Sequence, residues 1–391
     1  MKFLSATRFP NLEVVRRAWR EYALEGASLS PDVRSYVGRA WRRSRALGCD
    51  PQLHRAEMLS STATLRMLTQ REELLRQLDP FLTALSRAAA PDRHAAILAD
   101  EYGHILQIAA DEDTLNDDGF PHPGSLLSEA TSGANGVGTA LAEDAYVELV
   151  GPEHYMEGFH PFTCQGVPVH SPDGTITAVL SMSVRRLETA DRVRDILFCA
   201  SEAAECELLA DWLAYSADSE QARVLERLRQ DIEQKLAIAR LRLEQAAARL
   251  SSGASASDPL DAAVEFARKF KRQAQVWRAL ATDENAVPEM ERIDFTDQVA
   301  DFMDLLQTEA RVALVRLTWG CVERLAVLEA PQVLAKQVLA AFLSAIQEST
   351  AGALIEVNVF KDEKVGRLQV RAVNPGSCHA RTYVATAPLI F

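Results

Sequence analysis

The sequence predicts an α+β protein in four parts: a helical N-terminus, an antiparallel sheet, a long helical hairpin and a C-terminal α/β sandwich. Three patterns carry this prediction. Apolar residues recur at helical spacing at the start of the chain, strands and turns follow, and a near-heptad repeat then precedes mixed helix and strand signals. The expected domains are residues 1–90, 91–186, 187–285 and 290–391.

Composition places the chain among ordinary globular proteins. Of its 391 residues, 48% are hydrophobic and 25% are charged, which is enough apolar material for two or three cores. The formal net charge of −13 provides no general attraction to nucleic acid. The chain has no apolar run of the roughly 20 residues that span a membrane, no secretory signal, and no CxxC pair among its six cysteines. We therefore expect a cytoplasmic protein with no direct nucleic-acid or membrane partner.

The N-terminal part is expected to be helical. Apolar spacing predicts one helix over residues 12–22. A second helix is expected to be capped by Ser30, with Pro31 in its first turn, and to end at Gly48. A third apolar repeat runs to Pro80 and resumes after it. The arginines of this part are interpreted as a solvated helix face rather than as DNA contacts.

Two β-hairpins are expected in the second part. The first joins apolar runs at 97–100 and 105–108. The second joins runs at 162–169 and 176–184 through Ser171–Gly174, where Pro presets φ and Gly supplies a positive φ. These hairpins predict the antiparallel sheet.

Residues 133–169 combine closely spaced glycines with polar and reactive side chains. Gly133, Gly136 and Gly138 indicate either backbone contacts that tolerate no Cβ or a ligand lying against the main chain. Their order, Gly-x-x-Gly-x-Gly, differs from the dinucleotide-binding fingerprint, and the Gly-Lys-Ser/Thr of a phosphate loop is absent from the sequence. Both interpretations of the glycines stay open at this point.

Short motifs occur around this segment in a fixed order. They are Ala40–Ser44 with Gly48 and Asp50-Pro51, Ser128-Glu129, Gly133–Asn135, Gly138–Leu141, Gly151–Tyr155, Thr163-Cys164 and Pro168-Val169. In this arrangement the chain resembles the GAF-type sensor domain of bacterial enhancer-binding activators that control acetoin, dihydroxyacetone and alcohol catabolism. The resemblance implies an antiparallel sheet with flanking helices. Those activators continue into an ATPase and a DNA-binding helix-turn-helix, and we expect neither in this chain.

The resemblance also implies a small oxygenated metabolite above the sheet, such as a short alcohol, a diol or an acetoin-like compound. The expected ligand-binding residues are Glu129, Asn135, Thr139, His154 and Cys164. Glu153, His154, His160 and Cys164 are also residue types that bind zinc or iron. A structural corner is the favoured interpretation of this cluster, so neither a metal nor a cofactor is expected. Cys164 has no flanking Lys or Arg that would activate a redox thiol.

A long helical hairpin is expected to follow the sheet. Apolar residues repeat at intervals of three and four over residues 225–250, with one irregularity near Ile232. A Ser-rich linker at 251–259 separates them from a second helix with an aromatic face over 266–280. An isolated hairpin would leave these stripes exposed, so we expect a homodimer in which two copies form a four-helix bundle.

The last part resembles the ATP-binding domain of sensor histidine kinases in the order of its helices and strands. Ala340 and Ser344 stand where that family carries its magnesium-binding Asn residues. Ala372-Val373-Asn374 stands where its Asp-x-Gly reads adenine. The helical hairpin contains no His to accept a phosphoryl group, and Arg cannot replace it. The resemblance therefore implies a degenerate, pseudokinase-like domain rather than an enzyme.

Together these features predict a signal-sensing regulator of the transcription of a catabolic pathway. Metabolite binding would pass through the dimeric helices to the pseudokinase-like domain. That domain is expected to bind a protein partner, either a transcription regulator or a response regulator. An active sensor histidine kinase or phosphotransfer protein with atypical motifs is the alternative. A metabolic or redox enzyme that uses the His and Cys cluster is a third interpretation.

Overall fold

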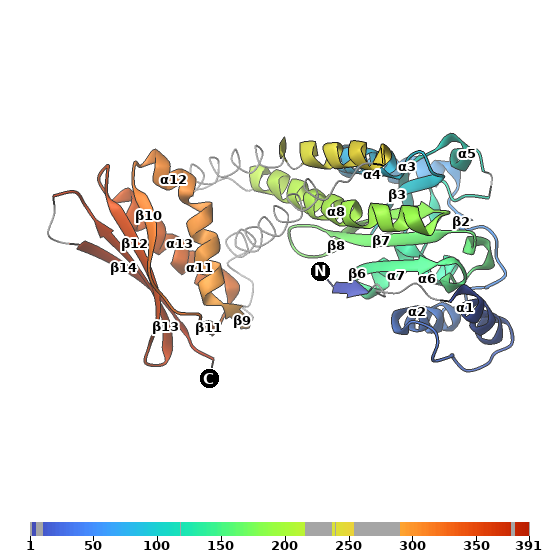
Figure 1. Cartoon of the computed structure of the whole chain (residues 1–391), viewed down its shortest axis with the longest axis horizontal. Coiled ribbons are helices and arrows are strands. Elements are labelled where there is room, and N and C mark those ends of the chain that lie inside the picture. The colour runs from blue at the N-terminus through green and yellow to red at the C-terminus, as the bar shows by residue number, and fades with distance from the viewer. Residues whose placement is uncertain are drawn as a thin grey trace. The chain divides into compact units, whose positions relative to one another are not determined.

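The computed structural model describes residues 2–4, 11–117, 119–215, 237–238, 240–253, 290–376 and 380–390 (Figure 1). The chain divides into two compact units. The first consists of Met1–Leu208 with Leu236–Ala267, and the second of Leu209–Lys235 with Arg268–Phe391. Within the described ranges, the helices are all too short or too polar to cross a membrane.

A six-stranded sheet forms the centre of the first unit. Its order is β1-β6-β7-β8-β3-β4, and every neighbouring pair is antiparallel except β1 and β6. Both predicted hairpins are confirmed, as β3–β4 and β7–β8, with Gly103 and Gly174 at positive φ in their turns. The strands are β1 Lys2–Leu4, β3 His94–Asp100, β4 Ile105–Ala110, β6 Ala145–Val150, β7 Thr163–His170 and β8 Ile176–Val184; β2 Glu57–Met58 and β5 Ser125–Leu126 form a separate pair.

Helices cover both faces of this sheet. They are α1 Leu12–Trp19, the π-helical turn η1 Arg20–Leu24, α2 Ser35–Ala46, α3 Ser61–Gln70, α4 Glu72–Ala89, α5 Glu112–Leu115, α6 Glu129–Ser132, α7 Gly136–Glu143, the 3₁₀ turns η2 Gly151–Glu153 and η3 Glu157–Phe159, and α8 Leu187–Tyr215. Strands β3 and β6 are buried along their whole length, which requires a packed layer on each side.

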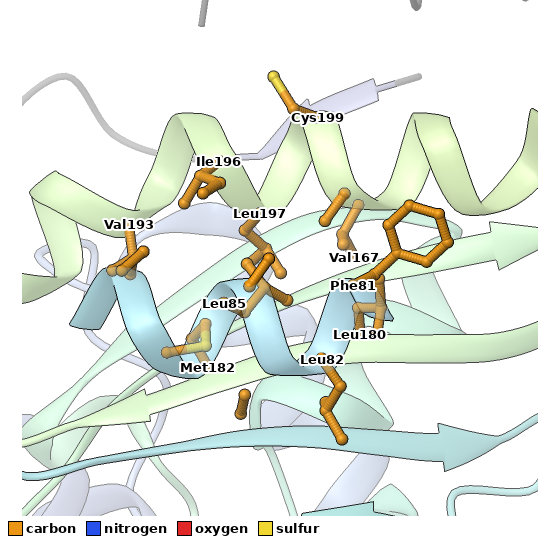
Figure 2. Close-up of a cluster of buried hydrophobic side chains, with 14 of the residues drawn as sticks. Phe81, Leu82, Leu85, Val167, Leu180, Met182, Val193, Ile196, Leu197 and Cys199 are labelled. Atoms are coloured by element: carbon orange, nitrogen blue, oxygen red, sulfur yellow. The ribbon is translucent and has the colours of Figure 1, made fainter. Parts of the chain in front are cut away.

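The two layers have different helices. On one face, α4 and α8 pack Phe81, Leu85 and Leu197 against Leu180 and Met182 of β8 (Figure 2). The opposite face carries α1, α2 and α7, and its core includes the fully buried Trp41. The helices before residue 91 therefore belong to the same compact unit as the sheet, because they supply part of both layers.

The predicted start of the second helix is wrong. Residues 31–33 form a turn, and α2 begins only after Arg34, whose backbone is extended. Ser30 instead accepts a hydrogen bond from the N–H of Asp32 (3.2 Å). The guanidinium of Arg34, the residue before α2, bonds to Glu153 (Nε–Oε1, 2.6 Å), far away in sequence.

The predicted interruption at Pro80 is also wrong, since α4 runs through it. Pro80 is exposed, whereas Leu78, Phe81 and Leu82 are buried against the sheet. Burial of these three side chains contributes roughly 1.5–3 kcal/mol each, which exceeds the cost of about 3 kcal/mol for a proline inside a helix.

Only part of the predicted helical hairpin lies in the described residues. Residues 240–251 are helical and belong to the first unit. Leu243 and Ala246, predicted to face a second copy, are buried in the same core as α4 and α8. Arg240 pairs with Glu207 of α8, so this helix is bound within its own chain. Leu225, Leu228, Ile232, Leu236 and Ala239, and the second stripe of Phe266, Phe270, Trp277 and Leu280, lie outside the described residues.

The second unit contains a four-stranded sheet in the order β10-β12-β13-β14 and a separate pair of β9 and β11. Its elements are β9 Glu291–Asp294, α11 Phe295–Leu305, α12 Gln307–Val312, β10 Arg316–Val322, β11 Ala326–Glu329, α13 Pro331–Gln347, β12 Leu354–Asp362, β13 Val365–Val373 and β14 Ala380–Pro388. Asp294 caps α11 by accepting from the N–H of Asp297 (3.1 Å).

Candidate functional site

The glycines of residues 133–138 allow helix α7 to lie directly on the sheet. A Cβ on Gly166 of β7 would lie 1.8 Å from the carbonyl oxygen of Gly136, and one on Gly138 would lie 2.4 Å from that of Leu127. Gly133 has a φ of +59° and packs against Tyr155. Backbone packing, rather than a ligand on the main chain, therefore accounts for these glycines.

A cavity of about 30 Å³ lies beside the start of α7, on the face of the sheet that α7 covers. A single buried water needs roughly 10–15 Å³, so this space admits only a few non-hydrogen atoms. Most of its wall is apolar. The lining residues are Ile97, Phe120, Pro121, Leu127, Asn135, Gly136, Val137, Phe159, Phe162, Cys164, Ser181 and Ser183.

The polar side of the cavity comes from neighbouring strands β7 and β8. Cys164 pairs with Ser183 in the sheet register, and its Sγ donates to the Ser183 hydroxyl (3.5 Å). Ser181 donates to the carbonyl oxygen of Gln165 (2.6 Å). Burial raises the pKa of Cys164 to about 11, so the thiol stays protonated at neutral pH and is not an activated nucleophile.

Asn135 is a predicted site residue whose side chain is committed to the fold. Its Oδ1 accepts from the N–H groups of Val137 and Gly138 (both 2.9 Å) and so caps α7. Its Nδ2 donates to the carbonyl oxygens of Leu127 (2.9 Å) and Gly133 (2.7 Å). Asn135 therefore lines the cavity without a free donor for a ligand.

Glu129 and Thr139, also predicted site residues, contact each other but do not line the cavity. The Thr139 hydroxyl donates to Glu129 Oε1 (2.9 Å), and Thr139 is fully buried. Arg43 of α2 holds both carboxylate oxygens of Glu129 (2.5 and 2.9 Å) and also binds Glu143 (2.7 Å). These bonds join α2, α6 and α7.

His154, the remaining predicted residue, is completely buried and lies outside the cavity wall. Its Nδ1 bonds to the carbonyl oxygen of Gly151 (2.9 Å), while Nε2 has no hydrogen-bond partner among the described residues. Burial lowers the pKa of His154 to about 3, so the ring is neutral. Of the five predicted residues, the structure brings only Asn135 and Cys164 to the cavity, and ligand binding by the set stays a prediction.

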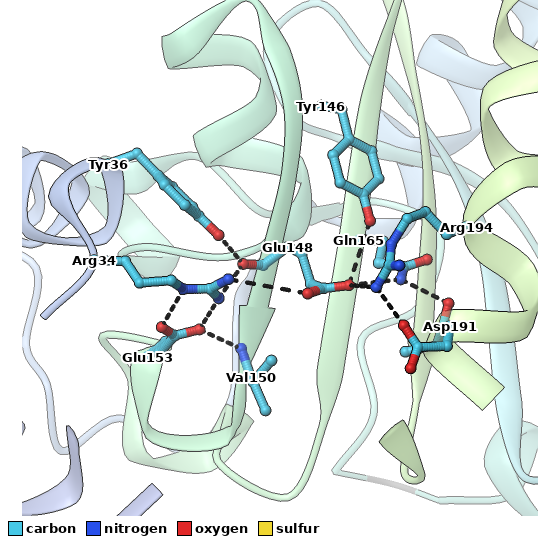
Figure 3. Close-up of polar contacts among 10 residues, drawn as sticks. Arg34, Tyr36, Tyr146, Glu148, Val150, Glu153, Gln165, Asp191 and Arg194 are labelled. Carbon is cyan, nitrogen blue, oxygen red and sulfur yellow. Dashed lines mark hydrogen bonds and ion pairs between the residues drawn. The ribbon is translucent and has the colours of Figure 1, made fainter. Parts of the chain in front are cut away.

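A network of buried charges lies at the end of strand β6 (Figure 3). Glu148 has a side-chain exposure of 1% and contacts Arg34 on one side (3.9 Å) and Arg194 of α8 on the other (3.0 Å). Arg34 also binds Glu153, whose Oε2 accepts from the N–H of Val150 (2.9 Å). Burial raises the pKa of Glu153, although the charge of Arg34 opposes this effect. The network supplies hydrogen-bond partners to the end of β6.

Sequence patterns missed several residues of these two sites. Ser181 and Ser183 alternate within the apolar run 176–184, which places both hydroxyls on one face of the strand. From that alternation the two serines could have been predicted to share one face of the sheet. Arg34 and Glu148 carry no such signal, because their partners lie far away in the chain. Among the described residues, no group of three His, Cys, Asp or Glu side chains is placed to hold a metal ion.

The first unit is an α+β domain: its central sheet carries helices on both faces, and the cavity lies on one of them. The chain belongs to the MimR N-terminal domain family, whose model matches residues 13–208. AcoR of Bacillus subtilis, the acetoin dehydrogenase operon transcriptional activator, is 24% identical over 206 residues, which cover 50% of this chain and 33% of AcoR. MimR of Mycolicibacterium smegmatis, the propane 2-monooxygenase operon transcriptional activator, is 27% identical over 194 residues, covering 48% and 32%.

Among solved structures, the crystal structure of the E. coli DhaR(N)–DhaL complex is similar with a TM-score of 0.44 and 17% identity. The match covers 50% of this chain and 66% of that one. This chain spans about a third of the length of the two activators.

Proposed function

We propose that this chain is a signal-sensing regulator whose first unit binds a small metabolite and controls transcription of a catabolic pathway through a protein partner. Membership of the MimR N-terminal domain family carries the proposal, because the named relatives activate catabolic operons. The matched segment also contains the cavity beside α7. The GAF-like character of this unit, its metabolite and its partner are parts of the proposal.

The second unit is proposed to act as a pseudokinase-like, partner-binding domain. Ala340 and Ser344 stand on α13 and offer no amide oxygen to a magnesium ion. Asn374 is used locally, since its Oδ1 accepts from the N–H of Thr350 (2.9 Å). An active kinase or phosphotransfer protein remains the alternative function. Two measurements with Mg-ATP distinguish these functions. The proposal expects calorimetry to find no micromolar binding, and it expects no acid-labile phosphate on the protein after incubation with labelled ATP.

The route from cavity to partner is proposed to start at α8. Strand β8 contributes Ser181 and Ser183 to the cavity and ends at Val184, and α8 begins at Leu187. A movement of β8 on ligand binding would therefore reach α8 across a two-residue connection. The proposed homodimer would transmit that movement between copies. Light scattering that finds a monomer at micromolar concentration would contradict the dimer.

The cavity itself is tested with a matched pair of substitutions. Val137 lines the cavity, whereas Val147 is fully buried in the same core away from it. We expect Val147→Phe to destabilise the fold by about 1–3 kcal/mol through overpacking, and Val137→Phe to cost less because part of its larger side chain can enter the cavity. A thermal-shift panel of short alcohols, diols and acetoin should find a stabilising compound for the wild type. Val137→Phe should lose that shift.

If Val137→Phe is as destabilising as Val147→Phe, the cavity is not available to a ligand. If both variants fold and Val137→Phe retains the full ligand-induced shift, the metabolite binds elsewhere. Either result contradicts the proposed sensor site.

A further inference from the structure

Two aromatic rings form the outer part of the cavity wall. Phe120 and Phe162 both line the cavity, and their ring centroids lie 5.7 Å apart in an edge-to-face arrangement. Phe120 is 6% exposed, whereas Phe162 is partly exposed, so this pair, the aromatic cover, has one side towards the cavity and one towards solvent. The free volume behind it is about 30 Å³, so a molecule of more than a few atoms enters only if the cover moves.

Arg185 holds both rings of this cover. Its guanidinium carbon lies 4.6 Å from the centre of the Phe162 ring, which is a cation–π contact. Its Nη2 also binds Asp117 Oδ2 (3.3 Å). Asp117 in turn positions Phe120, because its backbone carbonyl oxygen accepts from the Phe120 N–H (2.9 Å) and its Oδ1 accepts from the N–H of Gly119 (3.0 Å). One side chain therefore fastens two rings that come from distant segments of the chain.

Arg185 also lies in the short connection between strand and helix. Strand β8 ends at Val184, and α8 begins at Leu187. The first turn of α8 has its own anchor, since the hydroxyl of the buried Thr189 donates to Asp92 Oδ2 (2.6 Å). Because so few residues separate Arg185 from this turn, a displacement of the start of α8 moves Arg185 away from Asp117 and Phe162.

From these contacts we infer that Arg185 is a latch that holds the aromatic cover closed and ties the opening of the cavity to a displacement of the start of α8. The inference rests on the proposed sensor function, because it describes how that site is closed and how its opening reaches α8. The ion pair is partly exposed, with side-chain exposures of 31% for Arg185 and 37% for Asp117. Contacts of this kind are weak enough to break reversibly, as a latch requires. Arg suits both contacts, because its planar guanidinium stacks on a ring while its N–H groups bind a carboxylate.

The reactivity of Cys164 measures this opening without a ligand. Cys164 lines the cavity, and the free volume beside it is too small for iodoacetamide. Labelling of the full chain with iodoacetamide, followed by mass spectrometry of the peptide that contains Cys164, therefore reports the open fraction. We expect Arg185→Ala to speed this labelling about tenfold, the combined scale of one exposed ion pair and one cation–π contact. Loss of a positive charge by itself raises the pKa of a nearby thiol and slows its reaction, so it cannot produce the increase.

Variants of the two arginines and of Asp117 locate the effect. Asp117→Asn keeps an oxygen for Gly119 but loses the charge, so it should speed labelling about threefold and add nothing in the Arg185→Ala background. Arg185→Lys keeps a charge but stacks less well, so it should give an intermediate rate. Arg186→Ala is the matched control, because this neighbouring arginine is 72% exposed and binds Asp92 instead of the cover. It should leave the rate unchanged.

The link to α8 is tested from the other end. Thr189→Val removes the hydrogen bond to Asp92 with little change in shape, and so loosens the first turn of α8. It should speed the labelling of Cys164 about threefold in the otherwise unchanged chain, which is part of the contribution of one hydrogen bond. In the Arg185→Ala background it should have no effect, because the latch is already open. Equal acceleration in both backgrounds would contradict the link.

Two further results would overturn the latch. One is a labelling rate for Arg185→Ala no higher than that for Arg186→Ala. The other is an equal rise in the labelling of Cys49, which is buried in the same unit and would report unfolding rather than local opening.

These outcomes are separate from failure of the proposed sensor function, because the labelling uses no metabolite. If the latch variants behave as expected and the thermal-shift panel finds no stabilising compound, the sensor proposal fails and the latch remains. A stabilising compound together with unchanged labelling in Arg185→Ala would leave the sensor site without the latch.

Discussion

Two groups of buried polar side chains in the first unit differ in what their hydrogen bonds are used for. The buried carboxylates of Glu129, Glu148 and Glu153 use nearly all of their hydrogen-bonding capacity on other residues of the chain. The cavity wall of Ser181 and Ser183 leaves a donor and an acceptor unused. The residues that look most reactive therefore stabilise the fold, whereas the two serines of the cavity wall keep part of their hydrogen-bonding capacity unused.

The reason for this division is the cost of an isolated buried charge. A carboxylate such as Glu153, which is fully buried, must be paired at all times, whether or not a ligand is present. A buried hydroxyl that lacks a hydrogen-bond partner costs much less free energy, so it can stay unpaired in the absence of a ligand. The network is not entirely satisfied, since Arg34 Nη1, Arg194 Nε and Gln165 Oε1 lack hydrogen-bond partners among the described residues.

The largest predicted effect comes from breaking the charged network. Arg34→Ala removes the main partner of Glu153, and the side chain of Arg34 is only 11% exposed. Loss of one member of a buried pair destabilises a protein by about 3–5 kcal/mol. Urea unfolding of the full chain measures this loss. Arg39→Ala is the control, because Arg39 is 43% exposed where it binds Glu143, and it should cost less than about 1 kcal/mol. If Arg34→Ala and Arg39→Ala lower the free energy of unfolding equally, the contrast between buried and exposed ion pairs is wrong.

A smaller effect separates Asn135 from the cavity serines. Asn135→Ala removes the cap of α7 and leaves two carbonyl oxygens unpaired, so it should cost about 2–3 kcal/mol. Ser183→Ala loses only a weak thiol hydrogen bond and should cost less than about 1 kcal/mol. Thermal and urea unfolding of both variants test this order. If Ser183→Ala is the more damaging change, the serine serves the fold and the comparison fails.

The smallest effect concerns a third, partly exposed cluster that links β7 to α7 and α8. His170 binds Glu205 (Nδ1–Oε1, 2.6 Å) and Asp144 (Nε2–Oδ1, 2.8 Å). Its hydrogen bond with Glu205, together with both negative charges and against the effect of burial, raises the pKa of His170. Because the folded-state pKa is raised, the stabilisation is complete below the unfolded value of about 6.5 and is lost as pH rises through the folded value.

We therefore expect His170→Asn to destabilise the protein by less than about 1 kcal/mol at pH 6 and by less still at pH 9. Urea unfolding of wild type and variant at both pH values gives the difference. A larger difference at pH 9 than at pH 6 would mean that the neutral ring, rather than the imidazolium, makes the stabilising contact.

Local patterns were sufficient for much of the fold. The hairpins β3–β4 and β7–β8 follow from alternating apolar runs and from turns with glycine, which depend on neighbouring residues only. Helical spacing likewise located α1 and α4, although Ser30 and Pro80 misled the prediction of where helices start and stop. Arg34, which precedes α2, bonds to Glu153, and this bond joins residues 119 positions apart.

The sequence alone was enough to predict an α+β chain with two β-hairpins and with no histidine in its helical hairpin, whereas it left the reason for the glycines at 133–138 open. Periodicity and turn chemistry are short-range effects, so a single sequence contains them. Only the tertiary structure decided that Asn135 and Glu129 are consumed by the fold while Ser181 and Ser183 face the cavity. Which polar groups remain unpaired depends on partners brought together by strand order and helix packing, and these long-range contacts leave no periodic trace in the chain.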